Sequence, residues 1–353
     1  MTPQVPFLTF LIITVVKLLV VFVITLTAVA YTVLLERKII GRMQNRWGPS
    51  RTGPFGLLQP LADGIKLFLK EDMMPLAVAR PLFIIAPMIA LVCAMVSISV
   101  VPFGALTLVK GVDIFQVANV NIALLVILGI TSIGVYGIAL SGWSSNNKFA
   151  LLGSLRATSQ MISYELALGL SLVGVVLRSG SLNLRDIVDS QAAHGALSWN
   201  VFGGFQIVAF FIYLISAYAE ANRSPFDLPE AESELVAGYH TEYSSMKFAM
   251  FFMAEYANMI TISCVATLLF FGGASSPFGH LFPAFGGIYV QAALSVFWFV
   301  FKIFSFLFLF IWVRSTLPRF RYDQLMSFGW KFLMPVAMAN IIVTSLVMAL
   351  KAR

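Results

Sequence analysis

The chain has 353 residues, of which 59% are hydrophobic and only 11% are charged, and its mean hydropathy is +0.90. A soluble domain carries roughly a quarter charged residues, so the composition excludes a soluble protein and predicts a single polytopic membrane domain over residues 1–353. The net charge of +7 does not indicate nucleic-acid binding, because the basic residues lie between apolar runs and not on one soluble face.

Eight apolar runs are long enough to cross a membrane as helices, which takes about 20 residues each. They predict an all-α integral membrane protein with about eight transmembrane helices, near residues 11–35, 82–101, 118–140, 157–177, 200–219, 248–271, 288–313 and 332–350. The first run is expected to stay as a span and not to be a cleaved signal, because no small-residue cleavage site follows it.

The basic residues predict the orientation of these spans. With the first loop placed inside, sixteen of the 23 Lys and Arg residues fall in inside loops, five fall outside, and Lys17 and Lys302 lie within spans. Because positive residues collect on the cytoplasmic or matrix side, both termini are expected on the outer, periplasmic side.

The first inside loop, from Glu36 to Arg80, contains a helical pattern near residues 56–72. Its apolar positions repeat at helical spacing, and its polar residues fall mostly on the other side; the apolar set is Leu57, Leu58, Leu61, Ile65, Phe68 and Leu69. This pattern indicates an amphipathic helix that lies on the membrane interface, packs against the protein's own spans, or does both.

The same loop begins with a run of arginines after Glu36, at Arg37, Arg42, Arg46 and Arg51. Arginine binds carboxylates and polar head groups through two parallel hydrogen bonds, so these residues could bind a lipid-soluble substrate with a polar head. The alternative is that they only anchor the loop on the positive inside.

Residues 220–247 form an acidic inside loop with six carboxylates, at Glu220, Asp227, Glu230, Glu232, Glu234 and Glu242. Asp227 and Pro229 predict the start of a helix running from about Leu228 towards Tyr239. Like charges four residues apart on such a helix repel, so the group could store protons as a coupled set. The alternative is a solvated acidic face with favourable charge at a helix N-terminus.

Two further acids, Glu165 and Glu255, lie inside predicted spans. A charge at mid-membrane costs about 2.5–3.5 kcal/mol on insertion scales and usually faces the bundle interior along an ion or proton path. Together with Glu220 and the acidic loop, these residues could form a buried chain of carboxylates. The alternative is a structural ion pair with Lys302 or Lys17.

Catalytic and metal-binding signatures do not occur in the sequence. The two cysteines, Cys93 and Cys264, lie in apolar runs far apart, so no metal or iron–sulfur site is expected from this chain alone. No phosphate-binding loop or HExxH helix is present. No repeat relates the two halves, which argues against a transporter that acts alone.

Four long segments carry a resemblance to a known family. ERKIIGRMQNRWGPSRTGPFGLLQPLADGIKLFLKE, SGWSSNNKFALLGSLRATSQMISYELALG, EANRSPFDLPEAESELVAGYHTEYSSMKFAMFFMAEY and RSTLPRFRYDQLMSFGWK are similar to the quinone-chamber membrane subunit of respiratory complex I. This is the H subunit of the bacterial NADH:quinone oxidoreductase and subunit 1 of the mitochondrial enzyme. The resemblance covers nearly the whole chain.

The resemblance implies an eight-helix subunit with one extra surface helix and a quinone tunnel that opens between the first span, the amphipathic helix and a later span. It implies a quinone chamber lined or flanked by Arg37, Arg42, Arg46, Asp63, Arg223, Phe226 and Asp227. It also implies that a proton path starts at Glu165, Glu220, Glu230, Glu232, Glu234 and Glu255. Some relatives carry an acid within the third span; here Ser132 is the nearest polar candidate.

The function implied is that of a membrane subunit of proton-pumping NADH:quinone oxidoreductase, an enzyme complex. Quinone is the substrate, this chain binds no cofactor or metal of its own, and NADH, FMN and the iron–sulfur clusters belong to partner subunits. The implied partners are peripheral-arm and membrane-arm subunits, membrane lipids and quinone, in a bacterial inner membrane in preference to a mitochondrial one. The alternatives are the membrane anchor of an energy-converting hydrogenase and a stand-alone proton-coupled transporter.

Overall fold

The computed structural model describes residues 7–104, 107–109, 112–113, 115–192, 195–227, 237–278 and 287–351. Its helices are α1 (Phe7–Met43), α2 (Gln59–Leu69), α3 (Arg80–Ser99), α4 (Ala123–Ser144), α5 (Lys148–Ser179), α6 (Leu184–Gln191), α7 (Gln206–Glu220), α9 (Ser245–Phe270), α10 (Ile288–Thr316), α11 (Tyr322–Phe328) and α12 (Met334–Lys351). A π-helical turn, Gly329–Leu333, joins α11 to α12, and short 3-10 turns occur at Pro54–Gly56, Gly195–Ser198, Asn200–Phe202 and Gly238–His240.

The strands are a short antiparallel pair, β1 (Thr107–Val109) and β2 (Val112–Asp113), in which Val109 lies opposite Val112. The rest of the described chain is helical bundle and connections, so the all-α prediction is correct in its essentials.

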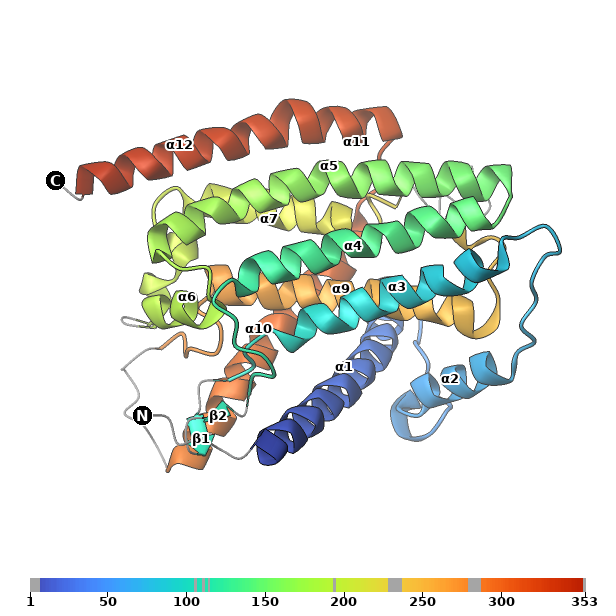
Figure 1. Cartoon of the computed structure of the whole chain (residues 1–353), viewed down its shortest axis with the longest axis horizontal. Coiled ribbons are helices and arrows are strands. Elements are labelled where there is room, and N and C mark those ends of the chain that lie inside the picture. Colours follow the sequence, from blue (N-terminus) through green and yellow to red (C-terminus); the bar gives the residue numbers. More distant parts are fainter. Residues whose placement is uncertain are drawn as a thin grey trace.

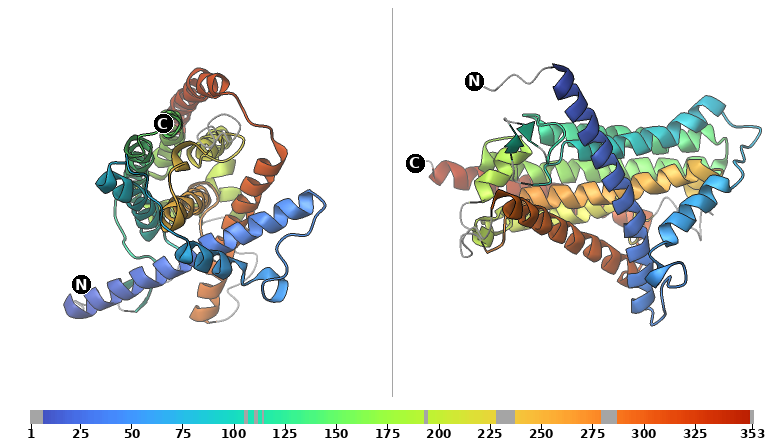
Figure 2. Two further views of the ribbon diagram at one scale, coloured as in Figure 1. Left: turned by 90° about the vertical axis from the view of Figure 1, so that its right-hand side faces the viewer. Right: turned by 90° about the horizontal axis from the view of Figure 1, so that it is seen from below.

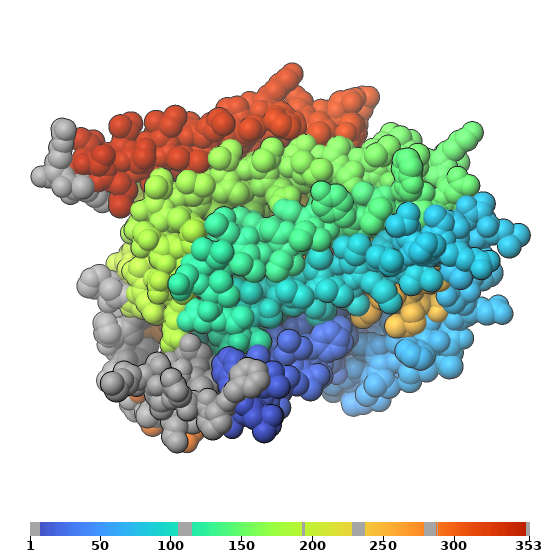
Figure 3. Space-filling model, in the orientation of Figure 1, coloured from blue at the N-terminus to red at the C-terminus, as the bar shows by residue number. Residues whose placement is uncertain are grey.

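The long helices form one bundle whose successive members run in alternating directions. Helices α3, α4, α5, α7, α9 and α12 lie roughly alongside one another, whereas α1 and α10 cross them obliquely (Figures 1 and 2). Figure 3 shows α12 as a ridge along the outside of α5. The first turn of α1 and the last turn of α12 both lie towards the left of Figure 1, and the segments 44–79 and 145–147 lie towards its right.

Seven helices in the described part of the chain are long and apolar enough to cross a membrane. In the segment 200–219, where an eighth span is predicted, the structure has the shorter helix α7, with 15 residues. At 1.5 Å per residue this helix is about 22 Å long, whereas the hydrocarbon core of a membrane is about 30 Å thick. Residues 200–202 form a 3-10 turn instead, and Gly204 has a φ of 75°, a left-handed conformation that stops a helix from continuing towards the N-terminus.

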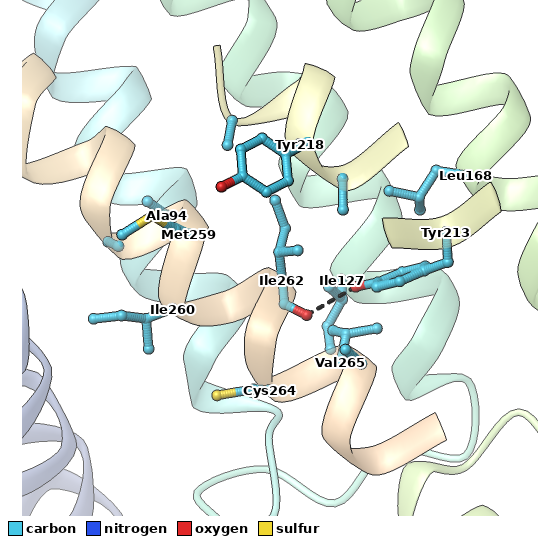
Figure 4. Close-up of a cluster of buried hydrophobic side chains, with 14 of the residues drawn as sticks. Ala94, Ile127, Leu168, Tyr213, Tyr218, Met259, Ile260, Ile262, Cys264 and Val265 are labelled. Atoms are coloured by element: carbon cyan, nitrogen blue, oxygen red, sulfur yellow. Dashed lines mark hydrogen bonds between the residues drawn. The ribbon is translucent and has the colours of Figure 1, made fainter. Parts of the chain in front are cut away.

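The bundle buries its apolar core around α9, whereas α1 exposes most of its apolar side chains. Figure 4 shows part of this core, where side chains of α4, α5, α7 and α9 meet. The Tyr213 hydroxyl there donates a hydrogen bond of 2.9 Å to the Ile262 carbonyl, since a buried phenol needs a polar partner. The broad exposed apolar surface of the outer helices fits a lipid environment.

Helix α2 lies within the segment expected to form an amphipathic helix, with Pro60 at a position that suits a helix start. Its contacts with α1 and α9 leave Leu61, Phe68 and Leu69 exposed. The helix therefore packs against the protein's own spans on one side and presents apolar side chains on another.

The acidic loop is described only at its two ends, residues 220–227 and 237–244. The helix expected from Leu228 to Tyr239 lies largely outside the described residues, and so do Glu230, Glu232 and Glu234.

Candidate functional site

A cluster of buried charges joins three helices at the end of the bundle where α1 ends. Glu36 in the last turns of α1 is 7% exposed, and Arg223, which follows α7, is 6% exposed. The Arg223 guanidinium lies 2.6 Å from the Glu255 carboxylate of α9 and 3.7 Å from the Glu36 carboxylate. Arg314, near the end of α10, also pairs with Glu36. Two carboxylates and two guanidinium groups therefore lie together, three of them largely buried and the fourth, Arg314, with 32% of its side chain exposed.

Tyr256 completes this cluster. Its hydroxyl donates a hydrogen bond of 2.7 Å to the second carboxylate oxygen of Glu36, and its ring lies 4.1 Å from the Arg223 guanidinium carbon. Buried charges are tolerated when they are paired and hydrogen-bonded, and a ring face adds a further attraction for a desolvated cation. We call these five residues, Glu36, Arg223, Glu255, Tyr256 and Arg314, the buried charge cluster.

An apolar cavity of ≈ 350 Å³ lies between α1, α2 and α9. Its walls are mostly aliphatic and aromatic, and polar groups occur at one part of it, where Arg37, Gln59 and Asp63 meet. The Arg37 guanidinium lies 2.6 Å from the Asp63 carboxylate, and the Gln59 amide donates a hydrogen bond of 3.0 Å to the other oxygen of Asp63.

A second, more polar hollow of ≈ 730 Å³ adjoins this cavity. Arg37 and Gln59 line both spaces, and Glu36 of the buried charge cluster lines the second one together with Arg46 and Arg51. The two spaces and the buried charge cluster thus share residues, so an elongated molecule with an apolar tail and a polar head has a continuous set of suitable contacts.

The expected chamber residues do not all meet at one point. Arg37, Arg46 and Asp63 line the two spaces just described, and Arg223 lies in the buried charge cluster. Arg42 lies instead over the Trp47 ring, with 4.5 Å between guanidinium carbon and ring centroid.

The other two expected chamber residues, Phe226 and Asp227, contact the linker between α10 and α11. Asp227 pairs with Arg319 at 3.2 Å. The Phe226 ring stacks on Phe320 with a centroid distance of 5.6 Å.

Three of the expected proton-path residues lie in series within the bundle. Glu255 and Glu220 both line a small cavity of ≈ 30 Å³ with Asn222 and Asn258, which is room for about one water molecule with polar partners. Glu165 of α5 is close enough to Glu220 for their charges to interact. All three carboxylates are partly buried.

Ser132 lies next in this series, because its hydroxyl contacts the Glu165 carboxylate from α4. Ser132, the polar residue of the third span where some relatives carry an acid, thus follows Glu165 at the end of the series Glu255, Glu220, Glu165.

Lys302, suggested as an ion-pair partner of a mid-span acid, contacts backbone carbonyls instead. Lys302 donates to the carbonyls of Phe271, Gly273 and Ser275 at 2.7–2.9 Å. Lys17 donates to the Gln116 carbonyl at 3.4 Å. The cation that pairs with Glu255 is Arg223.

Sequence reasoning missed Tyr256 and Arg314 and treated Glu36 only as part of an interfacial run. Glu36 and Arg314 are 278 positions apart, so no local spacing could connect them. The available signal was Glu36 itself, an acid within a segment otherwise rich in arginine. No group of three potential metal ligands occurs among the described residues, and Cys93 and Cys264 are free thiols on different helices.

These features define a class: a polytopic helical membrane protein with an apolar cavity that adjoins buried, paired charges and a row of carboxylates. A family model described as NADH dehydrogenase matches residues 16–345, so the chain belongs to the NADH dehydrogenase family. The predicted resemblance to the membrane subunit of complex I is thereby confirmed.

Curated relatives agree over almost the whole chain. The NADH-quinone oxidoreductase H subunit numbered 2 in Koribacter versatilis is 62% identical, with 97% of this chain and 98% of that protein covered. The H subunit numbered 1 in Solibacter usitatus is 49% identical, with 96% and 98% covered. The H subunit of the same enzyme in Leptospira biflexa is 52% identical, with 91% and 90% covered.

Proposed function

We propose that this chain is the membrane subunit of a proton-pumping NADH:quinone oxidoreductase in a bacterial inner membrane, where it forms much of the quinone tunnel and couples quinone reduction to proton translocation. The observation that carries the proposal is that the apolar cavity and the polar hollow share the lining residues Arg37 and Gln59, and that Glu36 of the buried charge cluster also lines the polar hollow. The names of the relatives support the assignment to this enzyme.

Quinone enters, in this proposal, between α1, α2 and α9. Its isoprenoid tail occupies the apolar cavity, whose lining offers few polar groups. Its head group then moves past the Arg37–Asp63 pair towards Arg46 and the buried charge cluster. Arg42 flanks this route on the far side of Trp47, and Phe226 and Asp227 bound it beyond Arg223.

The proton path begins at the buried charge cluster. A change of charge on the quinone acts strongly on Glu36 and Glu255, because electrostatic interactions are weakly screened in a buried site. Glu255, Glu220 and Glu165 then pass protonation along the bundle, with one water between the first two. Glu230, Glu232 and Glu234, which lie outside the described residues, join this path on the resemblance alone.

Partner subunits supply the rest of the reaction. NADH oxidation, FMN and iron–sulfur clusters belong to the peripheral arm, and antiporter-like subunits of the membrane arm move the protons. This chain holds and orients the quinone and transmits the charge change. No observation favours a hydrogenase-type anchor or a stand-alone transporter, and the relatives' names favour the quinone enzyme.

The decisive variant is Glu165→Gln, which keeps the shape of the side chain and removes its titratable group. We expect normal assembly, and at least a tenfold loss of proton pumping and coupled quinone reduction, since proton transfer at a positioned side chain contributes about 10²–10⁴-fold. The measurement is quinone reduction and pH-gradient formation in reconstituted vesicles.

The matched control is Glu71→Gln, an exposed acid beyond the end of α2, which should leave both rates unchanged. Full pumping in the Glu165→Gln complex would remove Glu165 from the path, and loss of assembly in that variant would point to a structural role.

A further inference from the structure

A second apolar groove lies beside α10, between that helix, α7 and α11. It has a volume of ≈ 580 Å³ and lies between the last turns of α7, the last turns of α10 and α11. Leu214 and Ile215 of α7 face Leu309 and Val313 of α10 across it, and Phe328 of α11 closes one side. Of its lining residues, Phe226 also bounds the quinone route proposed above.

The linker between α10 and α11 forms the rim of this groove, running along the outside of the bundle (Figure 2, left). It is fixed to the segment after α7, because the Phe320 backbone N–H donates a hydrogen bond of 3.2 Å to the Pro225 carbonyl. The linker is basic: it carries Arg319 and Arg321, and Arg314 lies just before it. The groove therefore combines an apolar interior with a positively charged rim.

Arg321 is the cation of this rim that is available to a ligand. Arg314 pairs with Glu36, and Arg319 pairs with Asp227. Arg321 is exposed and enters no ion pair with any acid in the described part of the chain. Phe320, which precedes Arg321, and Gln324, which follows it, both line the groove. The backbone of Arg321 therefore lies at the rim of the groove.

The lining of the groove indicates the kind of occupant. Apart from Gln324 and the hydroxyl of Tyr218, the residues that line it are apolar. It suits a single flexible hydrocarbon chain. A basic pocket between transmembrane helices on the inside is also the environment that binds acidic phospholipid head groups.

We propose that the groove between α7, α10 and α11 binds an acyl chain of an anionic phospholipid, whose phosphate is held at the rim by Arg321. The lipid fills a space that side chains leave open, and it borders Phe226 and Phe320.

The test uses the intact membrane complex in vesicles that contain phosphatidylglycerol or phosphatidylcholine with a photoreactive diazirine on one acyl chain. After illumination and digestion, mass spectrometry locates the label. We expect phosphatidylglycerol to label the segments of α7, α10 and α11 that line the groove, and phosphatidylcholine to label them several-fold less. Removal of one cation near an anionic head group costs about fivefold in binding, so Arg321→Gln should lower the label by about that factor.

Leu309→Trp fills the groove and should abolish the label there for both lipids. Two matched controls should leave it unchanged: Leu346→Trp on the exposed face of α12, and Arg80→Gln at the start of α3. Equal labelling by the two lipids, or labelling that ignores both Arg321→Gln and Leu309→Trp, would overturn the proposal. So would a cross-link between a partner's transmembrane helix and the groove in the native membrane.

Discussion

Arg223 is the residue on which the buried charge cluster depends. It follows the short helix α7 and neutralises Glu255 directly and Glu36 in part. Arg223→Gln should leave Glu255 buried without its 2.6 Å partner, and breaking a buried pair from one side costs about 3–5 kcal/mol. We expect a lower yield of assembled complex and a lower thermal midpoint, measured by native electrophoresis and by thermal unfolding of the purified complex.

The double variant Arg223→Gln with Glu255→Gln is the control for that prediction. It removes a charge from each side, so most of the lost stability should return while quinone reduction stays impaired. If the double variant is as unstable as the single one, the pairing of Arg223 with Glu255 is not the source of the instability.

Ala30 offers a way to fill the apolar cavity without touching a charge. It is a half-buried residue of α1 that lines the cavity between α1, α2 and α9. Ala30→Trp should raise the apparent KM for a long-tailed quinone about tenfold, since overpacking costs about 1–3 kcal/mol and 1.4 kcal/mol is a factor of ten in binding.

Steady-state kinetics with long-tailed and short-tailed quinones checks this, with Val16→Trp on the exposed side of α1 as the matched control. A quinone without a long tail should be less affected. An unchanged KM for the long-tailed quinone would place its tail outside this cavity.

At the scale of elements, a buried hydroxyl links the end of α2 to the start of α9. The Ser245 hydroxyl lies 3.0 Å from the Leu67 carbonyl oxygen and 2.9 Å from that of Lys70, and it shares its one hydrogen between them. Both are carbonyls that a helix end leaves without an internal partner. Ser245 has a φ of 54°, an unusual conformation for a residue other than glycine. Helix α2, one wall of the cavity, is therefore fixed to the element that carries Glu255.

Ser245→Ala should loosen this attachment. The loss of a hydrogen bond is worth about 1 kcal/mol, so hydrogen exchange of the amides in Gln59–Leu69 should speed up about fivefold, with quinone KM rising in parallel. Ser244→Ala is the matched control, because its hydroxyl binds the Glu71 carbonyl at an exposed position. Equal exchange in both variants and the unaltered protein would show that α2 is held by its apolar contacts alone.

At the scale of the whole molecule, the chain presents a large exposed apolar surface and a basic end. Many of the largest apolar residues of α1, α10 and α12 are exposed, and in a membrane such surfaces contact lipid or other helices. We expect extraction in a mild detergent and native separation to yield the chain together with a flavin-bearing dehydrogenase module and antiporter-like subunits. Mass spectrometry identifies the partners; nickel-containing subunits, or a stable monomer that moves solute in liposomes, would contradict the proposed function.

The sequence predicted those features that depend on local composition. Apolar runs longer than about 20 residues form helices in a membrane because every backbone polar group must be paired within the segment, and the long helices follow those runs. The exception is the start of α7, where residues 200–204 turn before the helix begins. Hydrophobicity alone did not register the left-handed backbone conformation of Gly204.

The candidate site was only partly predictable. The unusual acids Glu165, Glu220 and Glu255 stood out because a charge within an apolar segment is expensive. The arginines after Glu36 stood out as a run, and the resemblance supplied Arg223. The partners of these residues did not stand out. Arg223 pairs with Glu255 and Ser132 contacts Glu165, whereas Lys302, which seemed a natural partner, binds backbone carbonyls.

What the sequence by itself determined was the kind of protein: a polytopic membrane subunit of a known family, with rare charges that had to serve some purpose. Only the tertiary structure decided which charges meet, because Glu36, Arg223, Glu255 and Arg314 come from separate segments that no local spacing relates. Pairing inside a low-dielectric interior depends on distances of a few ångströms, and those distances are set by how the helices pack.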